Sequence, residues 1–307
     1  KIIFMGTPIF CVPILKSLYQ NGYNISVVFT QPPQKSHRGQ KINKSPIQGI
    51  SETLNIDYRT PKTLKDNHEE YEFLKKLNAD LAIVCAYGQI IPENFLNLTK
   101  KGFVNIHASI LPSWRGAAPI QRSIMNLDPE TGISIMKIKK ELDSGPVSNI
   151  YKIKIDQNQN AQEISEKLSA LAAEKILDNV DDILEDKAKF IDQDHSKATY
   201  AKKIDKEESR IDWDEDASKI IGKINGLFPS PGASFSFNGE RYKILKAEIG
   251  NGIGQVGEII SNQLEVACNK NQSIKILEIQ RQGKRPQKIS EFMLGSQIKK
   301  GSKLSNV

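Results

Sequence analysis

The 307-residue chain has 38% hydrophobic and 26% charged residues, ordinary values for a globular protein, and its length favours two domains over one. Because no run of about 18 apolar residues occurs, we expect no membrane span. The short apolar run after Lys1 is expected to form a first core strand, not a signal peptide. Cys11, Cys85 and Cys268 are too few and too scattered for a disulfide framework or a zinc site, and they fit a reducing cytoplasm.

Positive charge is concentrated toward the carboxyl end. The whole chain has a net charge of +7, whereas residues 217–307 hold 14 Lys and Arg against 6 Asp and Glu, an excess of 8. Such a surplus indicates either a polyanionic partner, most commonly nucleic acid, or a surface that only aids solubility. Charge alone does not separate these two interpretations.

The first half alternates short apolar segments with segments of helical periodicity. We expect strands at residues 2–5, 25–30, 81–86, 102–107, 133–138 and 147–155. We expect helices after the turn at 6–8, at 46–54, at 67–77, from about 118 onward, and at 161–184. This alternation predicts an α/β fold with a Rossmann-like, mostly parallel sheet. Residues 31–46 are too rich in Pro, Gly and Lys to be regular.

The pattern changes after residue 186. The segment 186–208 lacks periodicity and is expected to be a linker, followed by a helix at 217–227. Short β-branched segments at 233–237, 242–248, 257–260, 264–267 and 274–279 then predict a small OB-like β-barrel. We therefore expect an α/β domain over residues 1–187, a linker over 188–207 and a β-barrel domain over 208–307.

Nucleotide-cofactor and metal chemistry are not indicated by the sequence. The first turn, MGTP, has one glycine, so the three-glycine dinucleotide fingerprint and the phosphate loop are both missing. The four histidines do not cluster with carboxylates, and we expect no metal site.

Three polar residues remain where catalysis would need them. Asn105 and His107, two apart in a predicted strand, project from one face at its carboxyl end. Asp143 lies in the loop ELDSGPV. A neutral His can donate to an oxyanion with one nitrogen while a carboxylate orients the other, and Asn adds an uncharged donor. The set suits acyl transfer to an amine that the substrate brings. The competing interpretation is a structural His and a turn-forming Asp.

The segment NIHASILPSWRGAAPIQ resembles the signature of the folate-dependent formyltransferases. LDSGPV resembles that family's Leu-Asp-Thr-Gly loop, with Ser144 in place of threonine, and VCAYGQIIP resembles the loop that cradles the pterin ring. Three further segments resemble the branch of the family that acts on methionyl-tRNA: FTQPPQKSHRG, YAKKIDKEESRIDW and GLFPSPGASF.

The resemblance implies transfer of a formyl group from 10-formyltetrahydrofolate to the α-amine of initiator methionyl-tRNA, without a metal. Asn105, His107 and Asp143 match the family's catalytic positions, with Asn105 and His107 holding the oxyanion and Asp143 orienting His107 and helping to move the proton. The positions that match the folate-binding loops are Ala86, Tyr87, Gly88, Gln89, Ser109, Ile110, Leu111 and Pro112.

The same resemblance gives the basic loop a partner, the acceptor end of the tRNA. Its matching cations are Lys35, Arg38, Lys41 and Lys44, with His37 among them, and Gln40 stands where lysine is usual. The basic barrel is expected to contact acceptor-arm phosphates. A solvated loop without a partner is the alternative. For Arg115, two roles stay open: binding carbonyls of its own loop, or contacting substrate.

Two other classes of function compete with this one. A formyltransferase of the same fold that acts on a small amine would need neither the basic loop nor the basic barrel. A non-catalytic RNA-binding protein would not be expected to keep Asn105, His107 and Asp143 together. We expect a monomer in the cytoplasm.

Overall fold

The computed structural model describes residues 1–35 and 42–304 and forms two compact units. Unit 1 comprises Lys1–Gly116, Gly132–Ile153 and Ser165–Tyr200, and unit 2 comprises Ala117–Thr131, Lys154–Ile164 and Ala201–Val307. None of the helices in the described part of the chain combines the length and apolar character that a membrane span needs.

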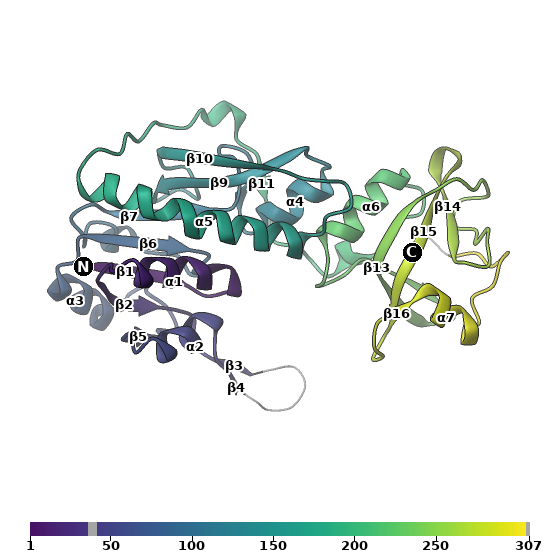
Figure 1. Ribbon diagram of the computed structural model, residues 1–307, viewed down its shortest axis with the longest axis horizontal. Helices are drawn as coiled ribbons and strands as arrows, with labels where there is room; N and C mark the ends of the chain where they lie inside the picture. The colour runs from purple at the N-terminus through teal and green to yellow at the C-terminus, as the bar shows by residue number, and fades with distance from the viewer. Residues whose placement is uncertain (36–41, 305–307) are drawn as a thin grey trace. The chain divides into compact units, whose positions relative to one another are not determined.

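Unit 1 is built on a seven-stranded sheet of order β10-β9-β7-β6-β1-β2-β5 (Figure 1). Its strands are β1 (Ile2–Gly6), β2 (Ile25–Phe29), β5 (Tyr58–Arg59), β6 (Leu81–Cys85), β7 (Phe103–His107), β9 (Glu130–Lys137) and β10 (Val147–Lys154). The pairs β5–β2, β2–β1, β1–β6 and β6–β7 are parallel, whereas β9 runs antiparallel to β7. The sheet is therefore mixed beyond β7.

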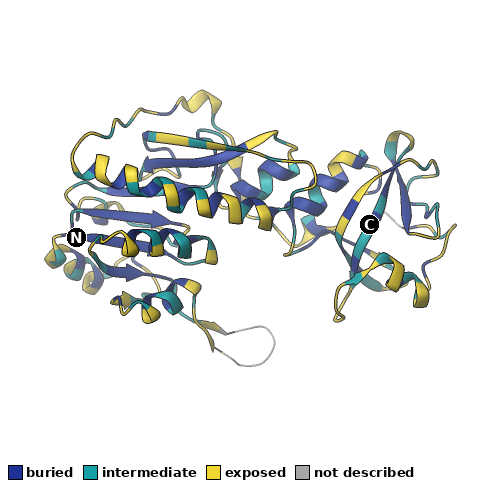
Figure 2. Ribbon diagram, in the orientation of Figure 1, coloured by how far each residue is buried: buried dark blue, intermediate teal, exposed yellow. Residues whose placement is uncertain are grey.

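Both faces of the central strands are covered, as the continuous apolar runs of β1 and β6 predict. Two helices, α1 (Val12–Gln20) and α5 (Ala161–Leu184), lie side by side on one face, where the Ser17 hydroxyl donates to the Ala173 carbonyl (Figure 1). On the other face Leu74 packs into a core with Ile3 and Phe29. In Figure 2 the central strands β1 and β6 are accordingly coloured as buried.

The remaining elements of unit 1 are short. They are η1 (Ile9–Cys11), β3 (Gln34–Lys35), β4 (Ile42–Asn43), α2 (Pro46–Thr53), α3 (His68–Leu77), η2 (Glu93–Phe95), β8 (Arg115–Gly116) and η3 (His195–Lys197). Helix α2 begins with a Ser45 cap, whose hydroxyl accepts from the Gln48 N–H, and Pro46 at the first helical position. These turn signals explain why the predicted starts of the helices agree with the structure to within a few residues.

Unit 2 joins helices to an antiparallel sheet of order β12-β13-β15-β14, with β16 paired to β15. Its elements are α4 (Pro119–Met125), β11 (Tyr200–Ala201, at the border of the units), η4 (Glu207–Ser209), α6 (Ala217–Gly226), β12 (Ser234–Phe237), β13 (Glu240–Gly250), β14 (Glu265–Cys268), η5 (Asn269–Asn271), β15 (Gln272–Arg281), β16 (Gln287–Lys288) and α7 (Ile289–Gly295). The expected strand at 257–260 forms only isolated bridges, such as Ile259 with Val266. Helix α7 was not expected.

Within unit 2, helices α4 and α6 approach closely because α6 carries two glycines at the contact. A Cβ on Gly226 would lie 2.5 Å from Met125 Cγ, and one on Gly222 would lie 2.8 Å from Leu127 Cδ2. Larger side chains would force the helices apart. An ion pair joins the same region, since Arg122 of α4 binds both carboxylate oxygens of Glu208.

The predicted fold class was a Rossmann-like, mostly parallel sheet followed by a small OB-like β-barrel, and it is confirmed as a mostly parallel α/β sheet followed by an antiparallel β domain. The predicted boundaries at residues 187 and 208 stay a prediction. Residues 188–200 belong to unit 1, because Val147 and Ile191 exchange backbone hydrogen bonds and the Arg115 N–H donates to the Thr199 carbonyl.

Candidate active site

Strand β7 carries two of the predicted catalytic residues to the carboxyl edge of the parallel strands. Asn105 and His107 share one face of the strand, and His107 is only 6% exposed. The Asn105 amide is half-buried and makes no hydrogen bond with any described residue. It is therefore a donor available to a ligand.

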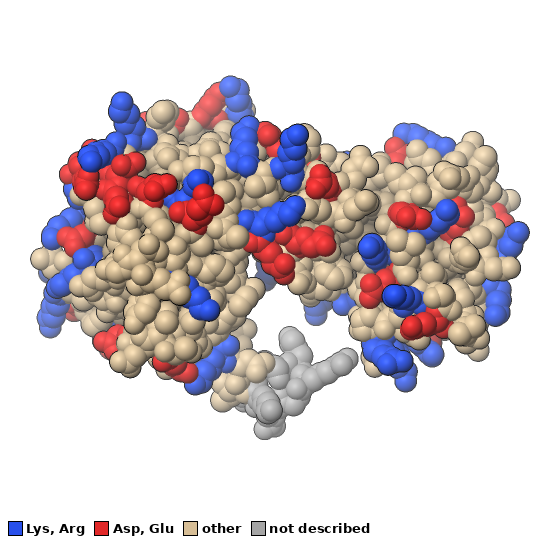
Figure 3. Space-filling view, in the orientation of Figure 1, with Lys and Arg blue, Asp and Glu red and all other residues tan. Residues whose placement is uncertain are grey.

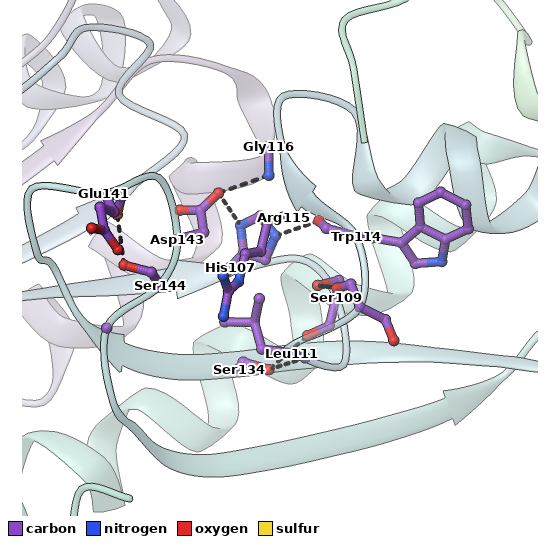
Figure 4. Close-up of polar contacts among 12 residues, drawn as sticks. His107, Ser109, Leu111, Trp114, Arg115, Gly116, Ser134, Glu141, Asp143 and Ser144 are labelled. Carbon is purple, nitrogen blue, oxygen red and sulfur yellow. Dashed lines mark hydrogen bonds and ion pairs between the residues drawn. The ribbon is translucent and has the colours of Figure 1, made fainter. Parts of the chain in front are cut away.

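His107 has an acceptor at each ring nitrogen (Figure 4). Its Nε2 lies 2.9 Å from the Trp114 carbonyl oxygen, and its Nδ1 lies 3.6 Å from Asp143 Oδ2. A carbonyl can only accept, so Nε2 carries a proton and donates it to Trp114. The neutral ring then presents an unprotonated Nδ1 to the carboxylate, and a second proton on Nδ1 would complete an ion pair.

Asp143 is held in place from its own loop and from the loop after β7. The Gly116 N–H donates to Asp143 Oδ2 at 2.8 Å, and the side chain is 14% exposed. The backbone of Asp143 has a φ of 46°, in the left-handed region that non-glycine residues seldom adopt. The carboxylate is thus fixed toward His107 although it comes from a loop 36 residues away in sequence.

The roles of the two His107 nitrogens differ from the expected ones. We expected one nitrogen to face an oxyanion directly, but Nε2 is bound to the Trp114 carbonyl. Of the three expected catalytic side chains, Asn105 is the one whose donor is free among the described residues. The Trp114 ring itself points away from His107 in Figure 4.

In the loop of residues 109–112, the side chains of two predicted folate-binding residues make contacts within the protein. The Ser109 hydroxyl donates to the Ser113 carbonyl at 2.6 Å, and Leu111 packs against Met136 and Val147. Ser134 of β9 fixes the backbone, since its hydroxyl donates to the Ser109 carbonyl and accepts from the Leu111 N–H. This leaves Ile110, Pro112 and the backbone as the parts of this loop that can face a ligand.

The loop of residues 86–89 follows β6 and is shaped by polar contacts. The Tyr87 carbonyl accepts from Thr7 Oγ1, and the Gly88 carbonyl accepts from Gln31 Nε2, both at 2.8 Å. Burial raises the pKa of the Tyr87 phenol and keeps it neutral. The N–H groups of Gly88, Gln89 and Ile90 make no hydrogen bond with a described residue, and Ile90 is 88% exposed.

A cavity of about 850 Å³ adjoins the Asp143 loop. Its lining includes Glu141 and Ser144, on either side of Asp143, together with Lys137, Lys139 and Lys140. None of the predicted catalytic or folate-binding residues lines it. The cavity therefore neighbours the site without containing the groups expected to react.

The predicted basic loop is only partly described. Lys35 lies in β3, which pairs with β4, whereas Arg38 and Lys41 lie outside the described residues. The Lys44 ammonium is 2.9 Å from both carboxylate oxygens of Glu52, and this contact raises the pKa of Lys44. Lys44 would have to leave Glu52 to bind a phosphate.

Arg115 takes neither of its two open roles in the expected form. Its side chain is buried, and both Nε and Nη2 donate to Gln193 Oε1, at 3.1 and 2.7 Å. Gln193 was missed in the sequence because it lies in the aperiodic segment expected to be a linker. A glutamine in a stretch otherwise rich in Lys and Asp is only a weak signal of a buried contact.

Two family models match successive parts of the chain. The model "Formyl transferase" matches residues 1–180, and the model "Formyl transferase, C-terminal domain" matches residues 203–297. A mixed α/β sheet with a polar cluster at its edge, followed by an antiparallel β domain, thus defines a two-domain formyl transferase.

Full-length relatives place the chain within that class. It is 67% identical over 307 residues to a methionyl-tRNA formyltransferase of Pelagibacter ubique, covering 100% of this chain and 99% of the relative. It is 39% identical over 316 residues to a methionyl-tRNA formyltransferase of Mesorhizobium japonicum, covering 99% of each. The chain belongs to the methionyl-tRNA formyltransferase family.

Solved structures of other formyltransferases share the fold. WlaRD, a sugar 3N-formyl transferase crystallised with dTDP and 5-N-formyl-THF, has a TM-score of 0.69 at 20% identity, covering 93% of this chain and 98% of its own. The N-formyltransferase of Helicobacter canadensis, in complex with folinic acid and dTDP-3-aminofucose, has a TM-score of 0.69 at 18% identity, covering 92% and 99%. At such identities the likeness shows the fold alone.

Proposed function

We propose that Asn105, His107 and Asp143 are the catalytic residues of this enzyme. The protein transfers the formyl group of 10-formyltetrahydrofolate to the α-amino group of methionyl-initiator tRNA, giving the N-formylmethionyl-tRNA used in translation initiation. The observation that supports the residue assignment is the juxtaposition of a buried His107, a carboxylate at its Nδ1 and the unpartnered amide of Asn105 on the same strand face.

Each of the three groups has a distinct task. Asn105 donates a hydrogen bond to an oxygen that gains negative charge, at no cost in proton transfer. The His107–Asp143 pair takes up the proton that the attacking amine gives up, and returns it to the folate nitrogen that leaves when its bond to the formyl carbon breaks. Because Nε2 is already protonated toward Trp114, the new proton belongs on Nδ1, where the Asp143 carboxylate stabilises the imidazolium.

The folate contacts are part of the proposal. When bound, 10-formyltetrahydrofolate supplies the formyl group. The loop of residues 86–89 fits its pterin ring, because free backbone N–H groups beside an exposed Ile90 offer donors next to an apolar surface. The 109–112 loop contributes its backbone, Ile110 and Pro112, while Ser109 and Leu111 hold the loop in shape.

The tRNA contacts are proposed from charge. Lys35, Arg38, Lys41 and Lys44 of the basic loop meet the acceptor end, and the excess of positive charge in residues 217–307 binds phosphates. Such contacts give affinity with little sequence readout. A monomer acting in the cytoplasm completes the proposal.

A substrate comparison tests the function. The protein is incubated with the formyl donor and, separately, with charged initiator tRNA, charged elongator tRNA and glycinamide ribonucleotide, and formylated product is measured. We expect product with the initiator tRNA at a rate well above the others. Formylation of the small amine alone would contradict the assignment, and equal rates with both tRNAs would contradict initiator selection.

A further inference from the structure

Residues 193–199 contact both of the loops that position His107 and Asp143. The Thr199 hydroxyl accepts from the Trp114 N–H at 2.9 Å, and the Thr199 carbonyl accepts from the Arg115 N–H at 2.8 Å. Gln193, six residues earlier, reaches the Asp143 loop. One short segment therefore hydrogen-bonds both to the loop that contains Trp114 and Arg115 and to the loop that contains Asp143.

The side-chain amide of Gln193 uses both of its acceptor positions and both of its donor positions. Its Oε1 accepts the two bonds from Arg115, and its Nε2 donates to the carbonyls of Asp143 and Gly145, at 2.8 and 2.7 Å. The residue is 9% exposed. Among neutral side chains, only glutamine and asparagine accept two bonds at one atom and donate two at another. Asparagine is shorter.

These contacts close a ring around the catalytic pair. Three consecutive residues supply it: the Trp114 carbonyl binds His107, the Arg115 guanidinium binds Gln193, and the Gly116 N–H binds Asp143. Gln193 then returns to the Asp143 backbone. Arg115 Nη2, which binds Gln193, also donates to His195 Nδ1 at 3.1 Å. The ring holds the backbone of Asp143 in its left-handed conformation.

We infer that Gln193 is a positioning residue for Asp143, anchored by Arg115, and that it contributes to turnover and not to substrate binding. The inference rests on the proposed catalytic role of Asp143. Gln193 binds the backbone on either side of residue 144 and makes no hydrogen bond to His107 or Asn105, so we expect its effect to pass through the loop. A displacement of about 1 Å at a reacting group is enough to cost about a hundredfold in rate.

Gln193→Glu is the informative variant. It keeps the shape and the bonds from Arg115, but it replaces the donor by an oxygen that repels the two carbonyls. We expect kcat to fall at least about tenfold, with the KM values for methionyl-tRNA and the formyl donor within about twofold of the parent. Arg115→Lys, which cannot bind Gln193 with two nitrogens, should lower kcat in the same way.

Asn179→Asp is the matched control. Asn179 is also buried, and its Nδ2 donates to two oxygens, the Tyr151 hydroxyl and the Lys175 carbonyl, both at 2.8 Å. It lies on α5 and makes no hydrogen bond to any of the site residues. The change therefore reproduces the loss of a buried amide donor. We expect the Tm of the Asn179→Asp protein to fall about as much as that of the Gln193→Glu protein, while its kcat stays unchanged.

A double-mutant cycle decides between positioning and general destabilisation. In an Asp143→Ala background, measured in single turnover with excess enzyme, Gln193→Glu should change the rate by less than about twofold. A full additional loss would overturn the inference, and so would a Gln193→Glu enzyme with the parent's kcat. If Gln193→Glu does not fold, Arg115→Lys is carried through the same cycle under the same criteria. An Asp143→Ala enzyme of normal kcat would instead refute the proposed catalytic residues.

Discussion

At the scale of single residues, the site is defined by what each polar group already binds. His107 Nε2 binds the Trp114 carbonyl, and Asp143 Oδ2 accepts from the Gly116 N–H and faces His107 Nδ1, whereas the Asn105 side-chain amide has no described partner. A structural histidine would need no carboxylate at its second nitrogen. The combination of a held pair and a free donor is what acyl transfer to an amine requires.

Asp143→Asn tests the carboxylate without changing its size. The amide oxygen can still accept from the Gly116 N–H, but it lacks the negative charge that stabilises an imidazolium with a proton on His107 Nδ1. We expect kcat to fall at least about a hundredfold while tRNA affinity stays unchanged, and His107→Ala to behave alike. Steady-state formylation and a tRNA-binding titration measure the two quantities. His68→Ala, at an exposed histidine, should match the parent. Equal losses of rate and of Tm would indicate a structural role.

The cysteines give a prediction about pH. Cys11, Cys85 and Cys268 are buried and free. Burial raises the pKa of the Cys268 thiol to about 12, and a hydrogen bond from Cys11 together with burial raises the pKa of Cys85. Because a raised pKa keeps the thiol protonated, little thiolate exists at pH 8.

Because burial shields all three sulfurs from reagent and little Cys85 or Cys268 thiolate is present, we expect iodoacetamide at pH 8 to leave all three thiols of the native protein unmodified and to alkylate all three in urea. Mass spectrometry of the intact protein counts the adducts. Raising the pH from 8 to 9 should accelerate alkylation in urea, where the pKa is ordinary, and not in the native state. Rapid labelling of the native protein would show that the cysteine surroundings open in solution.

At the scale of elements, the close contact between α4 and α6 in unit 2 depends on a glycine of α6. Gly226→Ala places a methyl group 2.5 Å from Met125 Cγ and 2.9 Å from the Gln121 carbonyl oxygen. We expect the free energy of unfolding to fall by about 1–3 kcal/mol, the usual cost of overpacking. Urea denaturation measures it.

Gly49→Ala is the control for that substitution. Gly49 lies in α2, and a Cβ there meets nothing within 4 Å. Alanine in place of glycine should leave the free energy of unfolding unchanged or raise it by about 0.5–1 kcal/mol, since glycine is the poorer helix former. If both variants lost stability equally, the loss would not come from the α4–α6 contact.

The elements also show where sequence reasoning succeeds. The buried strands β1 and β6 and helices with clear caps, such as α2, were predicted because their information is local: an apolar run, or a serine followed by a proline. The pair Asn105 and His107 followed from the two-residue repeat of a strand. Asp143 was a candidate because it stands in the loop ELDSGPV, but nothing local joins it to His107, and the family resemblance supplied the expected pairing.

The missed features depend on contacts that no periodicity encodes. Arg115 and Gln193 meet across 78 residues through two loops, and the glutamine stands in a segment whose composition predicted a linker. The turn-separated segment 257–260 has strand composition, yet it finds only isolated bridging partners. The antiparallel entry of β9 beside β7 was likewise hidden, since a buried strand has the same pattern in either direction.

At the scale of the whole molecule, charge is the property that matters for a polyanionic substrate. The net charge is +7, and residues 217–307 carry an excess of 8 positive charges. On the face drawn in Figure 3, lysine and arginine side chains are spread among acidic ones, so no single dense patch dominates that face. Binding of tRNA should therefore add many modest phosphate contacts.

The salt dependence of tRNA binding checks this. Each neutralised phosphate releases counterions, so we expect the Kd to rise more than about tenfold between about 50 and about 200 mM salt. Filter binding or fluorescence anisotropy follows it. The folate donor is a small molecule, so its affinity should change far less with salt. Its salt dependence serves as the control. A Kd for tRNA that is flat in salt would contradict the phosphate-binding role.

Each of three loops at the predicted site contains a non-glycine residue with a left-handed backbone: Ala86 at φ 43°, Trp114 at φ 61° and Asp143 at φ 46°. Such conformations are unfavourable by about 1 kcal/mol or more apiece for residues that carry a Cβ. Folding supplies that free energy before any substrate arrives. The loops consequently meet their ligands already ordered, so that little binding energy is diverted into arranging them and more of it remains to lower the barrier of the reaction.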